Sequence, residues 1–131
     1  MLFVWSDILE LVYKNKKLEE QCNDLKKAKK LFDGNSLLAT SLLSRINALK
    51  NAETIKDIIQ HKNFRFHKLE NKKGRNLDGY FAIDVKTIRD AWRIILQPLD
   101  ENKNVYSPCN IDEIATCVKI IKIEEVSYHY E

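Results

Sequence analysis

The sequence predicts an α+β fold, in which a small, twisted, mostly antiparallel sheet carries an N-terminal helical hairpin on one face. Three observations lead to this prediction. Residues 15–50 place apolar side chains at helical spacing, whereas residues after 62 alternate apolar and polar side chains as strands do. A short apolar run precedes the helices. The 131 residues have the length of one ordinary domain, which is expected to span residues 1–131.

A first strand and a first helix are expected between residues 8 and 32. The segment from Ile8 to Tyr13 is short and apolar, which is typical of a strand. From Asn15 onward the apolar positions recur as they do in a helix. The expected apolar face of this helix consists of Leu18, Cys22, Leu25 and Phe32.

A second helix is expected directly after Gly34. Glycine commonly ends a helix, and Asn35 or Ser36 is a natural N-cap for the next one. The apolar side chains of this second helix are Leu38, Leu42, Ile46 and Leu49. Because the connection is so short, the two helices should pair as an antiparallel hairpin. Thr54 is expected to cap one more short helical turn.

Alternation of side chains predicts strands in the C-terminal half. The apolar positions are Phe64 and Phe66, then Phe81, Ile83 and Val85, and then Trp92, Ile94 and Leu96. The segment from Gln97 to Thr116 is expected to be a long polar connection, with a helical turn at Ile111 to Ile114. A last strand is expected from about Cys117. Because the helices cover one face of the sheet, the other face is expected to stay partly open.

The composition argues against several function classes. The three cysteines form no C-x-x-C pair, so neither a disulfide scaffold nor a zinc site is expected. No motif typical of nucleotide binding, zinc proteases or serine hydrolases occurs, and no metal or cofactor is expected. Residues 1–5 are apolar but too short for a signal peptide or a membrane span. We therefore expect a cytoplasmic protein without membrane contact.

Basic side chains concentrate in one segment, although the net charge of the chain is only +3. They are Lys62, Arg65, Lys68, Lys72, Lys73 and Arg75. Glu70 is the only acidic residue among them. Such a cluster can neutralise several phosphates, which would make nucleic-acid binding dependent on salt. The alternative is a solvated basic loop, the commoner explanation of a run of charges.

The residues best suited to catalysis follow the last strand. His129 could move a proton near neutral pH, and it would share a strand face with Ser127 if the strand continued that far. Arg93, on a preceding strand, could hold phosphate oxygens through its two-pronged guanidinium. Tyr128 or Tyr130 could stack on a base. Together these groups suit RNA cleavage by transesterification, in which one hydroxyl loses a proton and another gains one.

Each of these residues also has a purely structural explanation. A histidine so close to the terminus is commonly a surface residue. Arg93 could pack on Trp92, or it could pair with Asp84 or Glu124 across the sheet. Tyr128 could cover the core at the edge of a strand.

In their order along the chain, these segments resemble the HigB branch of the RelE/ParE superfamily of toxins. The matching pieces are Phe66-His67-Lys68-Leu69, the strand from Gly79 to Val85, Trp92-Arg93-Ile94 and the terminal Tyr128-His129. The resemblance extends from about Ile8 to His129, so residues 1–7 look like an N-terminal extension. It implies a microbial-RNase-like sheet and a metal-independent mRNA endonuclease that acts on messages in the ribosomal A site. It also implies a cognate antitoxin with a helix-turn-helix domain, through which alone operator DNA would be bound.

Position by position, the resemblance implies catalytic roles for His129, Tyr128 and Arg93. RNA binding is expected from His67, Lys68, Lys72, Lys73 and Arg75. The sequence departs from the family at two places, with Ser127 where an acidic residue is frequent and Glu70 where a lysine is usual. The loop that contains Glu70 is also about four residues longer than in the family.

Two other functions remain open for such a chain. One is a non-enzymatic poison of DNA gyrase, as in the ParE branch of the same superfamily. The Tyr-His terminus favours the nuclease, because the gyrase-binding branch needs no proton-transfer residue there. The other is a degenerate toxin that serves only as an antitoxin-binding module, which the residues at positions 70 and 127 would explain.

Overall fold

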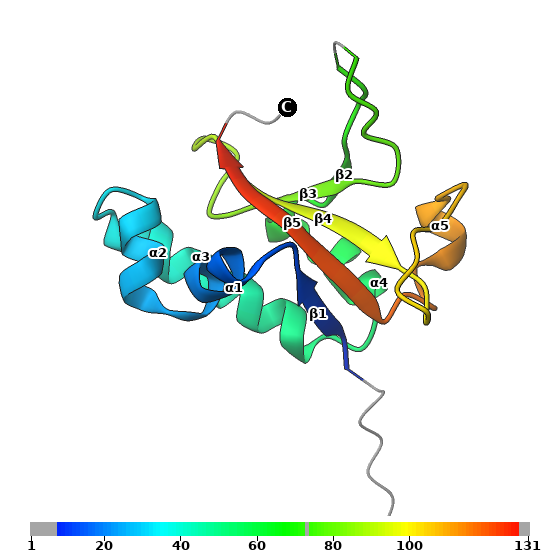
Figure 1. Cartoon of the computed structure of the whole chain (residues 1–131), viewed down its shortest axis with the longest axis horizontal. Helices are drawn as coiled ribbons and strands as arrows, with labels where there is room; N and C mark the ends of the chain where they lie inside the picture. Colours follow the sequence, from blue (N-terminus) through cyan, green and yellow to red (C-terminus); the bar gives the residue numbers. More distant parts are fainter. Residues whose placement is uncertain (1–7, 73, 129–131) are drawn as a thin grey trace, which may run out of the picture.

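The computed structural model describes residues 8–72 and 74–128, which form a five-stranded mixed sheet with helices (Figure 1). The strands are β1 (Glu10–Tyr13), β2 (His67–Lys68), β3 (Phe81–Asp84), β4 (Trp92–Leu99) and β5 (Ile120–Tyr128). Their order across the sheet is β1-β5-β4-β3-β2. β1 runs parallel to β5, and every other neighbouring pair is antiparallel. The predicted α+β class is thereby confirmed.

Most of the helices lie between β1 and β2 in the sequence. They are α1 (Lys16–Asn23), α2 (Leu25–Leu31), α3 (Ser36–Asn51), α4 (Ile55–Ile59), the 3₁₀ turn η2 (Lys62–Phe64) and α5 (Ile111–Ile114). In Figure 1, α3 and α4 lie behind the strands. Asn35 caps α3 as expected, because its side chain accepts a hydrogen bond from the amide of Leu38. Gly34 precedes it with φ 88°, a conformation that favours glycine.

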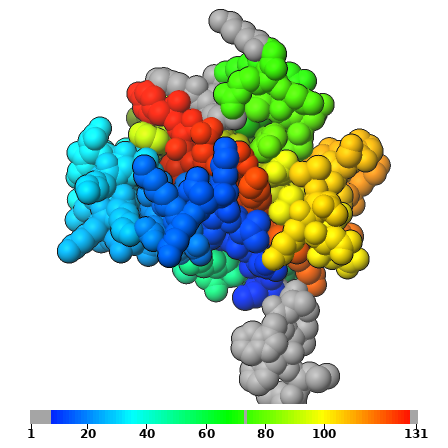
Figure 2. All heavy atoms as spheres, viewed as in Figure 1, coloured from blue at the N-terminus to red at the C-terminus, as the bar shows by residue number. Residues whose placement is uncertain are grey.

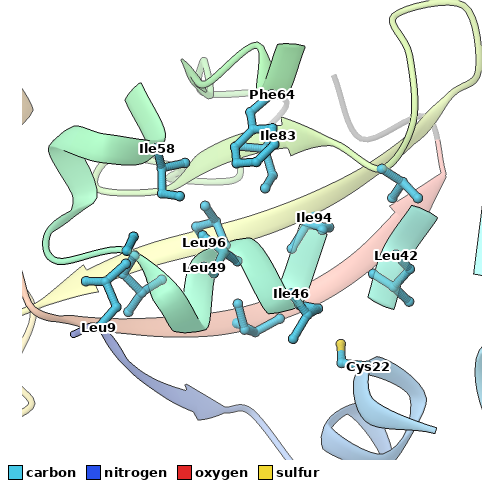
Figure 3. Packing of buried hydrophobic residues seen from close by; sticks show 14 of the residues in the cluster. Leu9, Cys22, Leu42, Ile46, Leu49, Ile58, Phe64, Ile83, Ile94 and Leu96 are labelled. Atoms are coloured by element: carbon cyan, nitrogen blue, oxygen red, sulfur yellow. The ribbon is translucent and has the colours of Figure 1, made fainter. Parts of the chain in front are cut away.

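The main hydrophobic core lies between the helices and one face of the sheet (Figure 3). Leu42, Ile46 and Leu49 of α3 are almost completely buried, and they face Ile94 of β4 and Ile83 of β3. Cys22 of α1 closes the same core. The apolar side chains that recur at helical and strand spacing in the sequence therefore meet in one cluster.

The single first helix that was predicted is wrong, because the chain breaks into α1 and α2. Asp24 has an extended backbone, with φ −126° and ψ 120°, and its side chain accepts a hydrogen bond from the amide of Lys27. An aspartate at this position caps a new helix instead of continuing the old one. Leu25, expected on the buried face, is consequently 42% exposed.

The strand predicted at residues 64–67 is also shorter than expected. Phe64 ends a 3₁₀ turn, and Arg65 follows in the left-handed conformation with φ 51°. That backbone interrupts the alternation that the sequence suggested, so β2 comprises only His67–Lys68.

The polar connection after β4 begins later than predicted, because β4 continues through Gln97 and Pro98 to Leu99. Pro98 pairs with Ile121 of β5, whereas β3 extends along β4 only as far as Leu96. Pro98 is tolerated because β3 does not reach this position, so no strand on the β3 side requires the amide hydrogen that proline lacks. β5 begins at Ile120 rather than near Cys117.

The strand register assigns side chains to the two faces of the sheet. Ile83 and Ile94 are paired and belong to the main core, so the neighbouring pair of Ala82 and Ile95 points to the other side. We call that side the open face; by the same register it carries His67, Ala82, Asp84, Arg93, Ile95 and Ser127. A small second cluster covers part of it, where Leu69 and Leu77 pack on Ala82 and Ile95.

Candidate functional site

Two of the predicted catalytic residues lie on opposite faces at the end of β5. Arg93 pairs with Ser127 on the open face, whereas Trp92 pairs with Tyr128 on the helix-covered face. The centre of the Tyr128 ring lies 5.3 Å from that of the Trp92 ring. The Trp92 ring also contacts the ring of Phe32 in the core, at 4.8 Å. The structure therefore does not bring Arg93 and Tyr128 to one surface. His129 lies outside the described residues.

Arg93 is held by several contacts within its own end of the sheet. Its side chain is only 8% exposed, and its Nε lies 3.2 Å from Oδ1 of Asp84. Its Nη1 donates hydrogen bonds to the backbone carbonyls of Asp90 at 2.7 Å and of Trp92 at 2.8 Å. These contacts favour the pairing with Asp84 that the sequence left open. The role of Arg93 in catalysis stays a prediction.

Asp84 is the carboxylate around which this network forms. It is 2% exposed and pairs with two guanidiniums, since Nε of Arg65 lies 3.0 Å from Oδ2. A buried carboxylate needs such partners, because removing a charge from water is costly. Glu124, the other possible partner of Arg93, instead pairs with Lys14 at 3.0 Å and Lys122 at 3.2 Å.

A third arginine, which sequence reasoning missed, closes the network from the helical side. Arg45 of α3 donates from Nε to the carbonyl of Asp84 at 3.0 Å and from Nη2 to the carbonyl of Lys86. Its guanidinium also lies 4.6 Å from the centre of the Phe64 ring. Burial lowers the pKa of Arg45, and the carboxylates of Asp84 and Asp90 oppose that shift. No pattern in the sequence links residue 45 to residue 84; only the packing does.

The expected RNA-binding residues divide between the sheet and a projecting arm. The arm consists of residues 69–80, and Figure 2 shows it in green at the same end of the view as the end of β5 in red. The backbone amides of Lys72 and Arg75 each donate a hydrogen bond to the carbonyl of the other residue. These bonds close a tight turn, in which Gly74 has φ 79°. Lys72 and Arg75 therefore lie on the two sides of the turn at the end of the arm. Lys73 lies outside the described residues.

His67 and Lys68 form the short strand β2 at the base of the arm. His67 pairs with Ala82 and so belongs to the open face, as does Arg93. Its Nδ1 lies 2.7 Å from the carbonyl oxygen of Arg65. A carbonyl can only accept, so Nδ1 carries the hydrogen, and in the neutral ring Nε2 is then the basic nitrogen. Nε2 is itself buried, so this nitrogen does not face a surface that a substrate could reach.

Lys68 lines a cavity of about 530 Å³ that sequence reasoning did not predict. The cavity lies between the arm and the segment after β4, and Gln97, Tyr106 and Cys109 also line it. Burial raises the pKa of the Cys109 thiol, and the charge of Lys68 opposes this. The nearly buried amide of Gln97 was the one available signal, because it interrupts the apolar run from Ile94 to Leu99.

Comparisons with known proteins return no match. No protein-family model, no curated protein and no solved structure matches the chain. Within residues 8–72 and 74–128, no three His, Cys, Asp or Glu side chains gather as a metal site would require. None of the helices formed by these residues has the length and apolar character needed to cross a lipid bilayer.

Proposed function

We propose that the chain is the toxin of a type II toxin–antitoxin system and acts as a ribosome-dependent mRNA endonuclease. The observation that carries the proposal is the ordered set of HigB-like segments, which ends in Tyr128-His129. The arrangement of the sheet is consistent with it, since the strand that leads to His129 lies directly beside Arg93. On this proposal the sheet is RelE-like, with the open face toward the RNA.

The proposed reaction is transesterification without a metal. A 2′-hydroxyl loses its proton and attacks the adjacent phosphorus, and the bond to the 5′-oxygen breaks as that oxygen gains a proton. His129 would move one of these protons, because imidazole exchanges protons near neutral pH. His67, at the base of the arm, would contribute to RNA binding and not to proton transfer, because its Nε2 is buried. The charge that grows on the phosphate would be met by Arg93 and the arm. Tyr128 lies on the opposite face, so it would contact a base only beyond the end of β5.

The ribosome serves as the second half of the proposed site. The described residues supply few catalytic groups, so the 2′-hydroxyl and the phosphate have to be aligned by another body. Lys68, Lys72, Lys73 and Arg75 would contact the RNA backbone through charge. A helix-turn-helix antitoxin would bind the free toxin, and operator DNA would be bound only through that antitoxin.

The test is expression of the wild-type chain and of His129→Ala without any partner. The wild type should arrest growth and cut translated mRNA but leave naked RNA intact. The variant should stay folded and lose about a hundredfold to ten-thousandfold in cleavage, as expected for a missing general acid or base. His61→Ala is the matched control, because His61 is exposed and lies in the segment before η2.

Two outcomes would contradict the nuclease. Undiminished toxicity of a folded His129→Ala variant would favour a gyrase poison. A harmless wild type that leaves mRNA intact on ribosomes would favour an antitoxin-binding module. The contacts of Arg93 support the antitoxin-binding module, because Asp84 and two backbone carbonyls already bind its guanidinium, as in a structural role.

A further inference from the structure

A groove lies beside the loop that follows β3, outside the surfaces discussed so far. Two hollows, of about 340 Å³ and about 400 Å³, share Lys86 and Thr87 in their walls. The first reaches Leu37 and Leu38 at the start of α3, and the second reaches Ile88. The two hollows therefore adjoin at Lys86 and Thr87, and we call them together the 86–90 groove.

The two most exposed large apolar side chains among the described residues border this groove. Leu37 is 68% exposed and Ile88 is 63% exposed. Single exposed aliphatic residues are ordinary, but two on the walls of one groove form an apolar contact surface. Neither lies on a loose segment, since Leu37 belongs to the first turn of the capped helix α3 and the loop that carries Ile88 is closed by hydrogen bonds.

The loop that presents Ile88 is fixed by the side chain of Asp90. The carboxylate of Asp90 accepts from the amides of Thr87 at 2.9 Å and Trp92 at 3.1 Å. Arg93 also donates to the carbonyl of Asp90. The exposure of Ile88 is therefore built into the fold, and a partner would find this side chain already in place.

The charged side chains around the groove are almost all basic. Lys62, Lys86 and Arg89 are exposed, and none of them forms an ion pair with another described residue. Arg45 and Arg65 lie deeper in the same walls. Of the two carboxylates, Asp84 is buried beneath the arginines and Asp90 is bound to its own loop. The groove thus presents a positive rim around two aliphatic contacts.

We propose that the 86–90 groove docks a short segment of a partner protein that combines acidic and aliphatic residues. The acidic residues would face Lys62, Lys86 and Arg89, and the aliphatic ones would cover Leu37 and Ile88. A protein segment fits better than RNA, because a phosphate backbone offers nothing to bury against two aliphatic side chains. The proposal depends on this surface alone and holds whether or not the chain is a nuclease.

The test selects binders to the whole chain from a phage-displayed library of random twelve-residue peptides. The enriched peptides should contain at least two Asp or Glu residues together with Leu, Ile or Val. A synthetic copy of the dominant peptide should bind at least tenfold more weakly to Leu37→Ser/Ile88→Ser and to Lys86→Glu/Arg89→Glu. It should bind unchanged to Leu25→Ser/Val105→Ser, which removes exposed apolar side chains elsewhere.

Several results would overturn the proposal. They are a library without enrichment, enriched peptides without acidic bias, and binding that the groove variants leave intact. A loss of ribosome or RNA binding in the Lys86→Glu/Arg89→Glu variant, with peptide binding unchanged, would assign the groove to nucleic acid instead. Circular dichroism and melting curves of each variant establish that it is folded before its affinity is compared.

Discussion

The two faces of the sheet are stabilised by different physical means. The helix-covered face is apolar, with Leu42, Ile83 and Ile94 fully buried against one another. The open face has only a small apolar cluster, and beside it Asp84 lies buried between Arg65 and Arg93. Burial of apolar area stabilises a fold without directional demands, whereas a buried ion pair needs its geometry kept.

This difference predicts that substitutions on the two faces will have different effects. An apolar cluster could replace a buried ion network at little or no cost in stability. The network instead fixes the positions of three chain segments, since Arg45, Arg65 and Arg93 come from α3, the link before β2, and β4. Substitutions in the apolar core of the covered face should therefore change stability alone, and those in the ion network of the open face should also change function.

The largest effect on stability is expected for Leu42→Ala. Leu42 is completely buried in the main core, and Leu→Ala at such sites costs about 2.7–5.0 kcal/mol. Urea denaturation measures the change, with Leu25→Ala as a control that should cost less than about 1 kcal/mol because Leu25 is partly exposed. The specific cleavage rate of the remaining folded protein should not change. A rate that falls in folded Leu42→Ala would mean that the two faces are coupled.

The next largest effect is expected for Arg93→Ala, on the order of 3 kcal/mol. The change leaves Asp84 buried with one of its two guanidinium partners, which costs less than losing both. Arg93→Lys should restore part of the stability but not the planar two-pronged contact. If Arg93 also meets the phosphate, single-turnover cleavage by folded Arg93→Lys will be slow. An unchanged rate would leave Arg93 with a structural role only.

A smaller effect is expected at the tip of the arm. Lys72→Ala with Arg75→Ala should weaken ribosome binding and reduce the slope of log affinity against log salt by about 0.7–0.9 for each phosphate that is no longer neutralised. Stability should stay the same, because the turn at the tip is closed by backbone bonds. Lys29→Ala with Lys30→Ala removes as many charges from α2 and should leave the slope unaltered. If both double variants lowered the salt slope equally, the arm would contribute only as general surface charge and not as a specific RNA contact.

The smallest effect concerns the pH dependence of stability at Glu124. Partial burial raises its pKa, but Lys14 and Lys122 outweigh this, so the pKa is lowered in the folded state. Such a group stabilises the fold above its unfolded pKa of about 4.3, and the contribution disappears as the pH falls through the folded value. Glu124→Gln should thus lower the melting temperature slightly at pH 7, with the difference vanishing in acid. A difference that persists at about pH 3, below the unfolded pKa, would point to packing instead.

Sequence periodicity predicted the covered face better than the open one. The apolar positions of α3, β3 and β4 repeat with the spacing of their elements, so Leu42, Ile83 and Ile94 could be assigned to the core without a structure. The ion network has no such repeat. Asp84 was considered as a partner of Arg93, but Arg45 comes from a distant helix, and only tertiary packing shows that it reaches the carbonyl of Asp84.

The helix break at Asp24 and the left-handed Arg65 were missed for a similar reason. Each depends on the backbone conformation of a single residue, whereas the spacing of apolar residues reports only on segments of several residues. The extension of β4 through Pro98 was missed because the rule against proline in strands depends on whether a neighbour is present, which the sequence does not state.

The parallel pairing of β1 with β5 has a consequence for how the chain is made. β5 lies between β1 and β4 in the sheet, and it is the last of the described strands to be synthesised. β1 and β4 therefore lack this neighbour until β5 has been made. Until then each presents an unpaired edge, which is a template for association with other chains. Contacts between such distant segments also form slowly. The sheet therefore cannot be completed before β5 has emerged from the ribosome.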